Sequence, residues 1–488
     1  MTKTEVLDNY KLNVNNVIID VSIEMVEDEP VPRYTVSITN MSNTTKLILE
    51  KIRQEFVSQV GSGLVEISEE KSLDQIKIQF RKELTVLLKK YFPSSDQETL
   101  DMLMNYVIEQ NLGLGNIEIL LKDEQIEEVV VNSSHEPIWI YHKKYAWVKT
   151  NIIIPQEERI RHFSTMIGRG VNKDISVLRP LLDAHLDTGD RVNATLSPIS
   201  SAGNTITIRK FSKAPWTITQ FLKNKTIDFD AAALVWLCIQ NELSVLISGG
   251  TGSGKTSMLN VISSFMPSNQ RIISIEDTRE LRLPRTLHWV PLVTRLPNPE
   301  GKGEITMLDL VVNSLRMRPD RIIMGEIRRQ KEAEVLFEAM HTGHSVYGTF
   351  HANDAEETVA RLINPPIDVP KLVLPAMTAI LVQNRNRRTN TRRTFQFAEI
   401  LPSGEPNIVL QYDPVNDDLK RVGTFQVIPK KLKMFVGMDE KGMLKDLAEK
   451  RQILKYLVDK DINDLDTIGS IISQYYRGTL LVKQQGKE

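Results

Sequence analysis

The sequence predicts an α/β protein in which a doubly wound, mostly parallel sheet follows an α+β region. Short apolar runs that alternate with helical patterns predict the sheet, and the clearest are 271–277, 321–326 and 345–350. A glycine-rich loop between a predicted strand and a predicted helix indicates a ligand site at the carboxyl edge of that sheet. At 488 residues the chain is too long for one core, so we expect several domains.

Changes in pattern along the chain predict five regions. Residues 1–95 combine alternating segments with two helical stretches and show no catalytic pattern, so we expect an accessory or docking role. Residues 96–210 predict the α+β domain, and a proline-containing break at 211–221 predicts a linker. Residues 222–425 predict the parallel-sheet domain, and 426–488 a helical tail. In the tail Ile468, Ile471, Ile472 and Tyr475 form one apolar helix face, which we expect to pack on the protein's own core.

Composition excludes several classes of protein. Lys and Arg (61) nearly balance Asp and Glu (62), so no global field attracts nucleic acid. The only cysteine, Cys238, lies in an apolar helical pattern and predicts a buried, reduced thiol, which excludes a disulfide framework or a multi-cysteine zinc site. The start of the chain lacks a secretory signal, and no apolar stretch reaches the ~20 residues that cross a membrane. We therefore expect a cytoplasmic protein that is at most peripheral to a membrane.

The glycine-rich loop fits the phosphate-binding pattern G-x-x-x-x-G-K-[ST]. It is preceded by an apolar run typical of a buried strand (243–248) and followed by a helical run that ends at Pro267. Backbone N–H groups and a helix N-terminus would converge on phosphate oxygens there, Lys255 would bind the β- and γ-phosphates, and Thr256 would reach Mg²⁺. A chance glycine-rich turn is the alternative. The predicted nucleotide-binding residues are Gly249, Gly250, Thr251, Gly252, Ser253, Gly254, Lys255 and Thr256.

Carboxylates flank two of the other predicted strands. Glu326 closes the apolar strand of RMRPDRIIMGE, and we predict that it orients or deprotonates the attacking water. Asp320 opens the same strand, and Glu276, Asp277 and Glu280 cluster after another strand. We predict that these three clustered acids support Mg²⁺ together with Thr256, because closely spaced carboxylates repel one another unless a cation is near. We predict that Asp320 also supports the metal. A solvated turn would explain any one of them alone.

Two histidines, His344 and His351, flank a third strand in TGHSVYGTFHAN. His351 ends that strand, so it can lie at the same sheet edge as Glu326 and respond to the γ-phosphate; zinc binding is excluded for want of further ligands at the usual spacing. The basic run at 383–394 has no interleaved aromatic residues. It predicts a solvated hairpin loop rather than a nucleic-acid site.

In this order, GGTGSGKT, IEDTRE, DRIIMGE and TGHSVYGTFHA resemble the Walker A, Asp box, atypical Walker B and His box of the secretion ATPase superfamily. That superfamily comprises the motors of type II and type IV secretion, type IV pili and the archaellum. PEGKGEITMLDLVVNSLRMRPD, HKKYAWVKTNI and RPLLDAHLDTGDRVNATLSP are similar to its Tad-like and archaeal branch. The resemblance covers roughly residues 100–425, so the role of the first 95 residues stays open.

The resemblance implies a RecA-like ATPase domain that is preceded in the chain by a PAS-like α+β domain, with ATP and Mg²⁺ as cofactors. It also implies a homohexameric ring in which arginines of the N-terminal domain complete a neighbour's site. By motif position these are Arg191 and Arg209, with Arg179 a weaker candidate; ordinary surface arginines are the alternative. The implied partner is a polytopic membrane platform protein. We therefore expect an ATP hydrolase that powers pilus-like filament assembly or protein secretion. The alternatives are a RecA-like nucleic-acid translocase and a nucleotide-gated scaffold that does not hydrolyse ATP.

Overall fold

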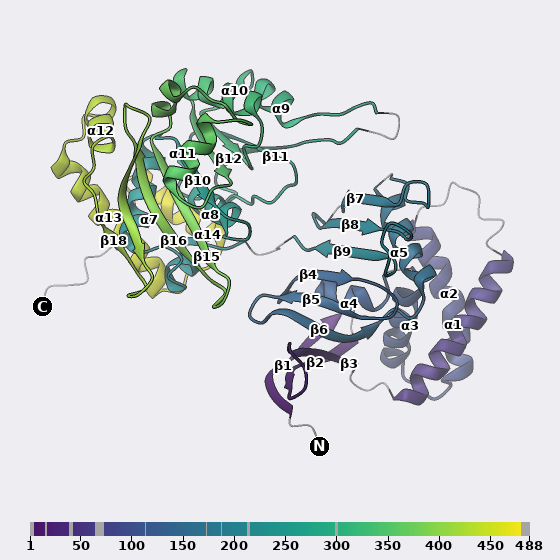
Figure 1. Ribbon diagram of the computed structural model, residues 1–488. Helices are drawn as coiled ribbons and strands as arrows, with labels where there is room; N and C mark the ends of the chain where they lie inside the picture. Colours follow the sequence, from purple (N-terminus) through teal and green to yellow (C-terminus); the bar gives the residue numbers. More distant parts are fainter. Residues whose placement is uncertain are drawn as a thin grey trace, which may run out of the picture. The chain divides into compact units, whose positions relative to one another are not determined.

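Figure 1 shows the computed structural model of the chain. It describes residues 4–14, 17–38, 42–63, 73–112, 114–171, 173–186, 188–211, 215–297 and 301–479. The chain forms two compact units, Met1–Ser212 and Lys213–Glu488. Part of the predicted linker, residues 212–214, lies outside the described residues.

The first unit combines helices with one sheet. Its described strands are β1 (Thr4–Val14), β2 (Val17–Val26), β3 (Arg33–Ile38), β4 (Ile126–Val131), β5 (Pro137–His142), β6 (Ala146–Ile153), β7 (Leu181–His185), β8 (Arg191–Thr195) and β9 (Thr205–Arg209). Its described helices are α1 (Asn43–Gly63), α2 (Leu73–Tyr91), α3 (Gln97–Leu112), α4 (Asn116–Lys122) and α5 (Glu157–Gly170).

The strands of this unit form a single sheet in the order β1-β2-β3-β6-β5-β4-β9-β8-β7. The sequence predicts that residues 1–95 form a region of their own. In the structure β3 pairs in parallel with β6 through Arg33 opposite Lys149 and Tyr34 opposite Thr150. The alternating buried side chains of β2 join the apolar core that α5 also covers. Helices α1, α2 and α3 enclose a small apolar core of their own.

The second unit begins with helices α6 (Ile218–Lys223) and α7 (Phe229–Gln240). Its described strands are β10 (Val245–Gly249), β11 (Arg271–Glu276), β12 (His288–Val293), β13 (Arg321–Met324), β14 (Ser345–Phe350), β15 (Ala379–Asn386), β16 (Thr391–Ile400), β17 (Pro406–Asp413) and β18 (Asp418–Arg421). The remaining described helices are α8 (Lys255–Ser263), α9 (Met307–Leu315), α10 (Gln330–His341), α11 (Ala355–Ile363), a 3₁₀ helix η2 (Lys371–Ala376), α12 (Ile428–Val436), α13 (Glu440–Asp459) and α14 (Leu465–Tyr476).

The sheet of the second unit runs β12-β11-β13-β14-β10-β15-β16-β17-β18. From β12 to β15 every pairing is parallel, and the pairings from β15 to β18 are antiparallel. All residues of β10, β13 and β14 are buried because helices cover both faces of the sheet. The predicted doubly wound α/β fold is confirmed, and β10 lies near the middle of its sheet.

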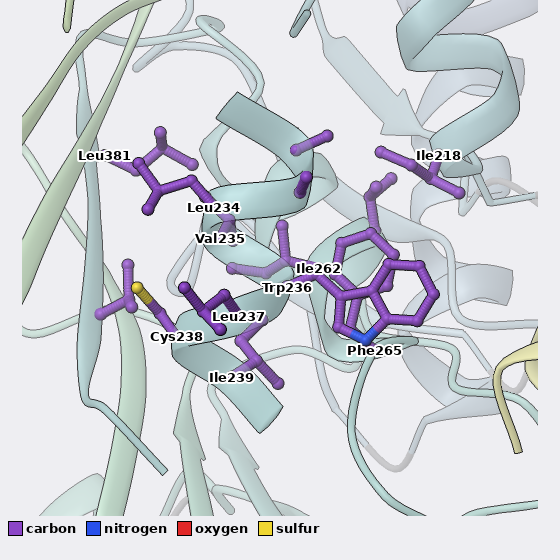
Figure 2. Packing of buried hydrophobic residues seen from close by; sticks show 14 of the residues in the cluster. Ile218, Leu234, Val235, Trp236, Leu237, Cys238, Ile239, Ile262, Phe265 and Leu381 are labelled. Atoms are coloured by element: carbon purple, nitrogen blue, oxygen red, sulfur yellow. The ribbon is translucent and has the colours of Figure 1, made fainter. Parts of the chain in front are cut away.

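Two apolar layers flank this sheet. Helices α7 and α8 contribute to the core on one face, and α10 and α11 contribute to the core on the other. Figure 2 shows the α7 side, where Trp236 stacks on Phe265 with ring centroids 4.9 Å apart. Cys238 lies in the same core as a buried free thiol, as predicted.

The C-terminal helices pack on this core, as the apolar face of α14 predicts. Ile468 and Ile472 are buried in the α7–α8 layer. Glu399 of β16 holds the start of α12, because its carboxylate accepts hydrogen bonds from the backbone N–H groups of Gln426, Val427 and Ile428. No helix in the described parts of the chain combines the length and the apolar character needed to cross a membrane.

Candidate nucleotide-binding site

The glycine-rich loop connects β10 to α8, as the sequence predicts. Gly254 precedes α8 with φ 92°, a left-handed conformation that glycine adopts without strain. At Gly249 a Cβ atom would lie 2.4 Å from the carbonyl oxygen of Gln383, so only glycine fits beside β15. The loop therefore keeps its backbone open in front of a helix N-terminus, where N–H groups can bind an anion.

Lys255 lies beneath this loop and is 8% exposed. Its Nζ donates to the carbonyl oxygen of Gly250 at 2.9 Å and lies 3.3 Å from His351 Nδ1. Burial lowers the pKa of Lys255 to about 8. In the described parts of the chain no carboxylate lies within hydrogen-bonding distance of Lys255 Nζ. A bound anion would therefore stabilise this ammonium, because burial disfavours a charge that has no opposite charge beside it.

Glu326 and His351 follow neighbouring parallel strands, β13 and β14, and therefore meet at the carboxyl edge of the sheet. His351 Nε2 lies 3.1 Å from Glu326 Oε1. Burial and the nearby Lys255 ammonium lower the pKa of His351, which favours the neutral ring. A neutral ring with the proton on Nε2 donates to Glu326 and accepts from Lys255, so these three side chains form one hydrogen-bonded series.

Arg328 is a site residue that is not among the predicted ones. Its Nη2 donates to Glu326 Oε2 at 2.6 Å, and its Nη1 donates to Asp277 Oδ2. The guanidinium thus links the end of β13 to the turn after β11. Its position two residues beyond Glu326 in GEIRR was the available signal, since a strand end presents alternate residues on the same side.

The three acids at the carboxyl end of β11 have different surroundings. Glu276 is 2% exposed, and its Oε1 accepts from the backbone N–H groups of Glu280 and Leu281, so it shapes the turn. Burial raises the pKa of Glu276 to about 7, and its Oε2 is buried without a hydrogen-bond partner. Asp277 is partly exposed and pairs with Arg328. Glu280 lies close enough for its charge to act on Lys255.

The metal role predicted for Asp320 is wrong. Asp320 precedes β13, and its Oδ2 accepts from the backbone N–H of Arg271 at the start of β11. In a parallel sheet the amino ends of the strands lie on the edge opposite the carboxyl ends. The length of β13 and its flanks separates Asp320 from Glu326 by roughly 15–20 Å. Asp320 therefore connects two strand starts.

The basic run at 383–394 forms the predicted hairpin between β15 and β16, but two of its arginines contact the phosphate loop. Arg392 Nε donates to the carbonyl oxygen of Gly252 at 3.0 Å. The guanidinium of Arg385 lies beside the same glycine, 2.9 Å from the place a Cβ would occupy. The expectation of a solvated loop is wrong for these two residues. A contact between segments more than 130 residues apart left no local signal.

Sequence comparisons place this site in a known family. A family profile described as type II/IV secretion system protein matches residues 179–393. The type IV secretion system protein PtlH of Bordetella pertussis is 30% identical over 265 residues, which cover 50% of this chain and 77% of PtlH. An uncharacterised protein of Methanocaldococcus jannaschii is 33% identical over 384 residues, which cover 76% of this chain and 69% of that protein.

This chain belongs to the type II/IV secretion system protein family.

Another M. jannaschii protein is 37% identical over 350 residues, and this chain spans about half of it, with 46% covered. Among solved structures, the pilus retraction motor PilT aligns at 16% identity over 76% of this chain and 94% of its own, with a TM-score of 0.44. The family assignment depends on the sequence comparisons alone.

The family match begins at Arg179 and includes the arginines predicted to complete a neighbour's site. Arg191 and Arg209 lie directly opposite each other on the antiparallel pair β8 and β9, and both are exposed. Arg191 Nη2 pairs with Asp183 Oδ2 at 3.1 Å. Arg179 is exposed in the turn before β7. The first unit thus presents Arg191 and Arg209 as neighbours on one surface.

The oxygen groups near the loop fit a magnesium ion that is held mainly by phosphates. Among the described residues no three or more His, Cys, Asp or Glu side chains form a metal cage. Mg²⁺ sites of this kind use one or two protein groups together with nucleotide oxygens. Thr256, which follows Lys255 in α8, and Asp277 supply suitable oxygens, and the unpartnered Glu276 Oε2 is a buried acceptor beside the same turn.

Proposed function

We propose that the second unit of this chain binds ATP on Gly249–Thr256 and hydrolyses it to ADP and phosphate. The observation that carries the proposal is the hydrogen-bonded series Lys255–His351–Glu326. It connects a buried cation at a phosphate-binding loop to a carboxylate at the same sheet edge. Phosphoryl transfer needs both groups, the cation to bind the terminal phosphates and the carboxylate to orient the nucleophile.

Each side chain has a role that its present contacts support. Lys255 exchanges the Gly250 carbonyl for phosphate oxygens. Mg²⁺, when bound, neutralises charge on the β- and γ-phosphates, and Thr256, Asp277 and Glu276 are the residues that would hold it. When phosphate binds Lys255, the hydrogen bond between Lys255 and His351 breaks, and it forms again after the phosphate leaves. This exchange lets His351 report the state of the nucleotide.

Glu326 orients the attacking water and takes its proton. Each of its carboxylate oxygens has one partner, Arg328 or His351, and keeps capacity for a further hydrogen bond. The water oxygen bonds to the γ-phosphorus while the bond to the bridging oxygen of ADP breaks. The proton passes through Glu326 to solvent, so the carboxylate is regenerated.

At the level of assembly, we propose a homohexamer in the cytoplasm, peripheral to a membrane, that energises pilus-like filament assembly or protein export. The family assignment and the relative PtlH, a type IV secretion system protein, support this role. Arg191 and Arg209 would enter a neighbour's site and stabilise charge in the transition state. A polytopic membrane protein would receive the motion.

Phosphate release from ATP, measured with and without DNA, tests the proposal. We expect release by the wild-type chain, none with Lys255→Ala, and wild-type rates with Lys331→Gln, an exposed cation on α10. Stimulation by DNA would favour a nucleic-acid translocase. Tight ATP binding without phosphate release by the wild-type chain would favour a non-hydrolysing scaffold.

A further inference from the structure

A cavity of about 390 Å³ lies against the proposed catalytic side chains of the second unit. Its walls include Glu326 and His351, the guanidinium-bearing residues Arg328 and Arg361, and the apolar residues Phe350 and Ile367. Residues Gly249–Thr256 are all described, and none of them lines it. Glu326 and His351 are therefore shared between the phosphate loop and this cavity.

The cavity belongs to the face of the sheet opposite the phosphate-loop helix. Helix α8 packs in the core with α7, whereas α11 and Ile367 pack in the core on the other face. Arg361 lies near the end of α11 and donates to the carbonyl oxygen of His351. A small ion that moved past Glu326 and His351 would therefore leave the face of the sheet that α8 covers. It would enter the cavity on the face that α11 covers.

Two guanidinium groups line this space. Arg328 pairs with Glu326 and Asp277, and Arg361 lies 3.7 Å from Glu357 Oε1. Both arginine side chains are about half exposed, at 54% and 52%. Each guanidinium carries five N–H donors, and planar guanidinium groups bind phosphate with paired hydrogen bonds. Among the described residues Arg328 has only carboxylate partners, and Arg361 has the carboxylate of Glu357 besides the carbonyl oxygen of His351, so an oxyanion can replace the carboxylates.

We propose that this cavity receives the inorganic phosphate formed by hydrolysis and releases it to solvent while ADP stays on the phosphate loop. The proposal rests on the proposed ATP hydrolysis. After cleavage two anions lie side by side and repel each other, and ADP blocks the phosphate's way back past the loop. Glu326 and His351 lie between the phosphate loop and the cavity. Once past them, the phosphate would meet the guanidinium groups of Arg328 and Arg361.

The experiment separates ATP cleavage from phosphate release in single-turnover mixing of the full-length chain with ATP. Acid quench measures cleavage, a fluorescent phosphate sensor measures free phosphate, and a fluorescent ADP analogue measures ADP release. For Arg361→Gln we expect cleavage at the wild-type rate and phosphate release slowed about fivefold or more, because release becomes the slow step. Arg361→Lys keeps a cation and should restore part of the rate.

Ile367→Phe narrows the cavity without changing its charge and should also slow phosphate release alone. Lys331→Gln, outside the cavity, should leave all three rates unchanged. Phosphate release at the wild-type rate in both Arg361→Gln and Ile367→Phe would overturn the proposal that phosphate leaves through this cavity. Cleavage slowed as much as release in both variants would also overturn it, since Arg361 would then act on the chemical step. Absence of cleavage in the wild-type chain would instead refute the proposed function, and the exit with it.

Discussion

His351 Nε2 and Glu326 Oε1 lie 3.1 Å apart at the ends of two adjacent parallel strands. On its other ring nitrogen His351 faces Lys255, so one imidazole joins the phosphate-binding cation to the proposed base. A change in the charge around Lys255 therefore acts on Glu326 both directly and through the His351 ring. This relationship is the basis of the first two predictions.

Replacing Glu326 with Gln should reduce ATP turnover by roughly 10²–10⁴-fold, the scale of general-base assistance, while ATP binding survives. Gln keeps the shape of the side chain but cannot take a proton from water. Steady-state turnover and the Kd of a fluorescent ATP analogue measure the two effects. Glu338→Gln, on an exposed position of α10, is the control. An unchanged turnover rate would show that Glu326 is not the base and would favour one of the acids at the carboxyl end of β11.

The lowered pKa of His351 predicts how turnover depends on pH. Burial and Lys255 both disfavour the protonated ring, so His351 becomes half-protonated only at a pH below the usual pKa of an imidazole. Protonation of His351 should therefore lower turnover only at a pH below 6.5. A pH–rate profile of the wild-type chain, compared with His351→Gln, checks this. A half-maximal rate at or above pH 6.5 that disappears in His351→Gln would contradict it.

Replacing Arg392 with Ala should weaken ATP binding about three- to tenfold, because the loop loses a charge-assisted hydrogen bond at Gly252. Equilibrium titration with a fluorescent nucleotide measures the Kd. Arg388→Ala removes an exposed arginine from the turn of the same hairpin and is the matched control. Equal affinities for the two variants would show that the Arg392 contact is not needed for nucleotide binding.

A mixing experiment tests whether Arg191 acts on a neighbouring subunit. Arg191→Ala and Glu326→Gln chains should each be nearly inactive alone, and their mixture should recover part of the activity. The reason is that some interfaces would then combine an intact arginine with an intact glutamate. The exposed ion pair of Arg191 with Asp183 contributes little stability, so the chain should still fold. A mixture no more active than its components would argue against action across an interface.

Replacing Glu399 with Gln should destabilise the C-terminal helices by about 2–4 kcal/mol. The carboxylate is fully buried and accepts three backbone N–H groups at the start of α12, whereas the Gln amide would direct a donor at some of them. Hydrogen exchange of α12 amides measures the local opening free energy. Glu405→Gln, at an exposed glutamate of the following turn, serves as the control. Unchanged protection of α12 would contradict this anchoring role.

Much of the fold and of the candidate site could be predicted because the signals are local. The strand, glycine loop and helix at 245–263 are consecutive in the chain, and their residue types limit the backbone directly. Glu326 and His351 could be placed together because each closes an apolar strand, and parallel strands end at one edge. The prediction for Asp320 was wrong because Asp320 opens its strand, and the starts of parallel strands lie at the edge opposite the loop.

The sequence by itself determined the phosphate loop, the doubly wound sheet and the strand-end side chains, since neighbouring residues set backbone conformation and hydrophobic period. Only the tertiary structure decided that β3 joins β6, that Arg392 contacts Gly252 and that Arg328 connects Glu326 to Asp277. These contacts join segments that are distant in the chain. They depend on strand order, register and side-chain direction, which are set by the packing of the whole unit rather than by any local pattern.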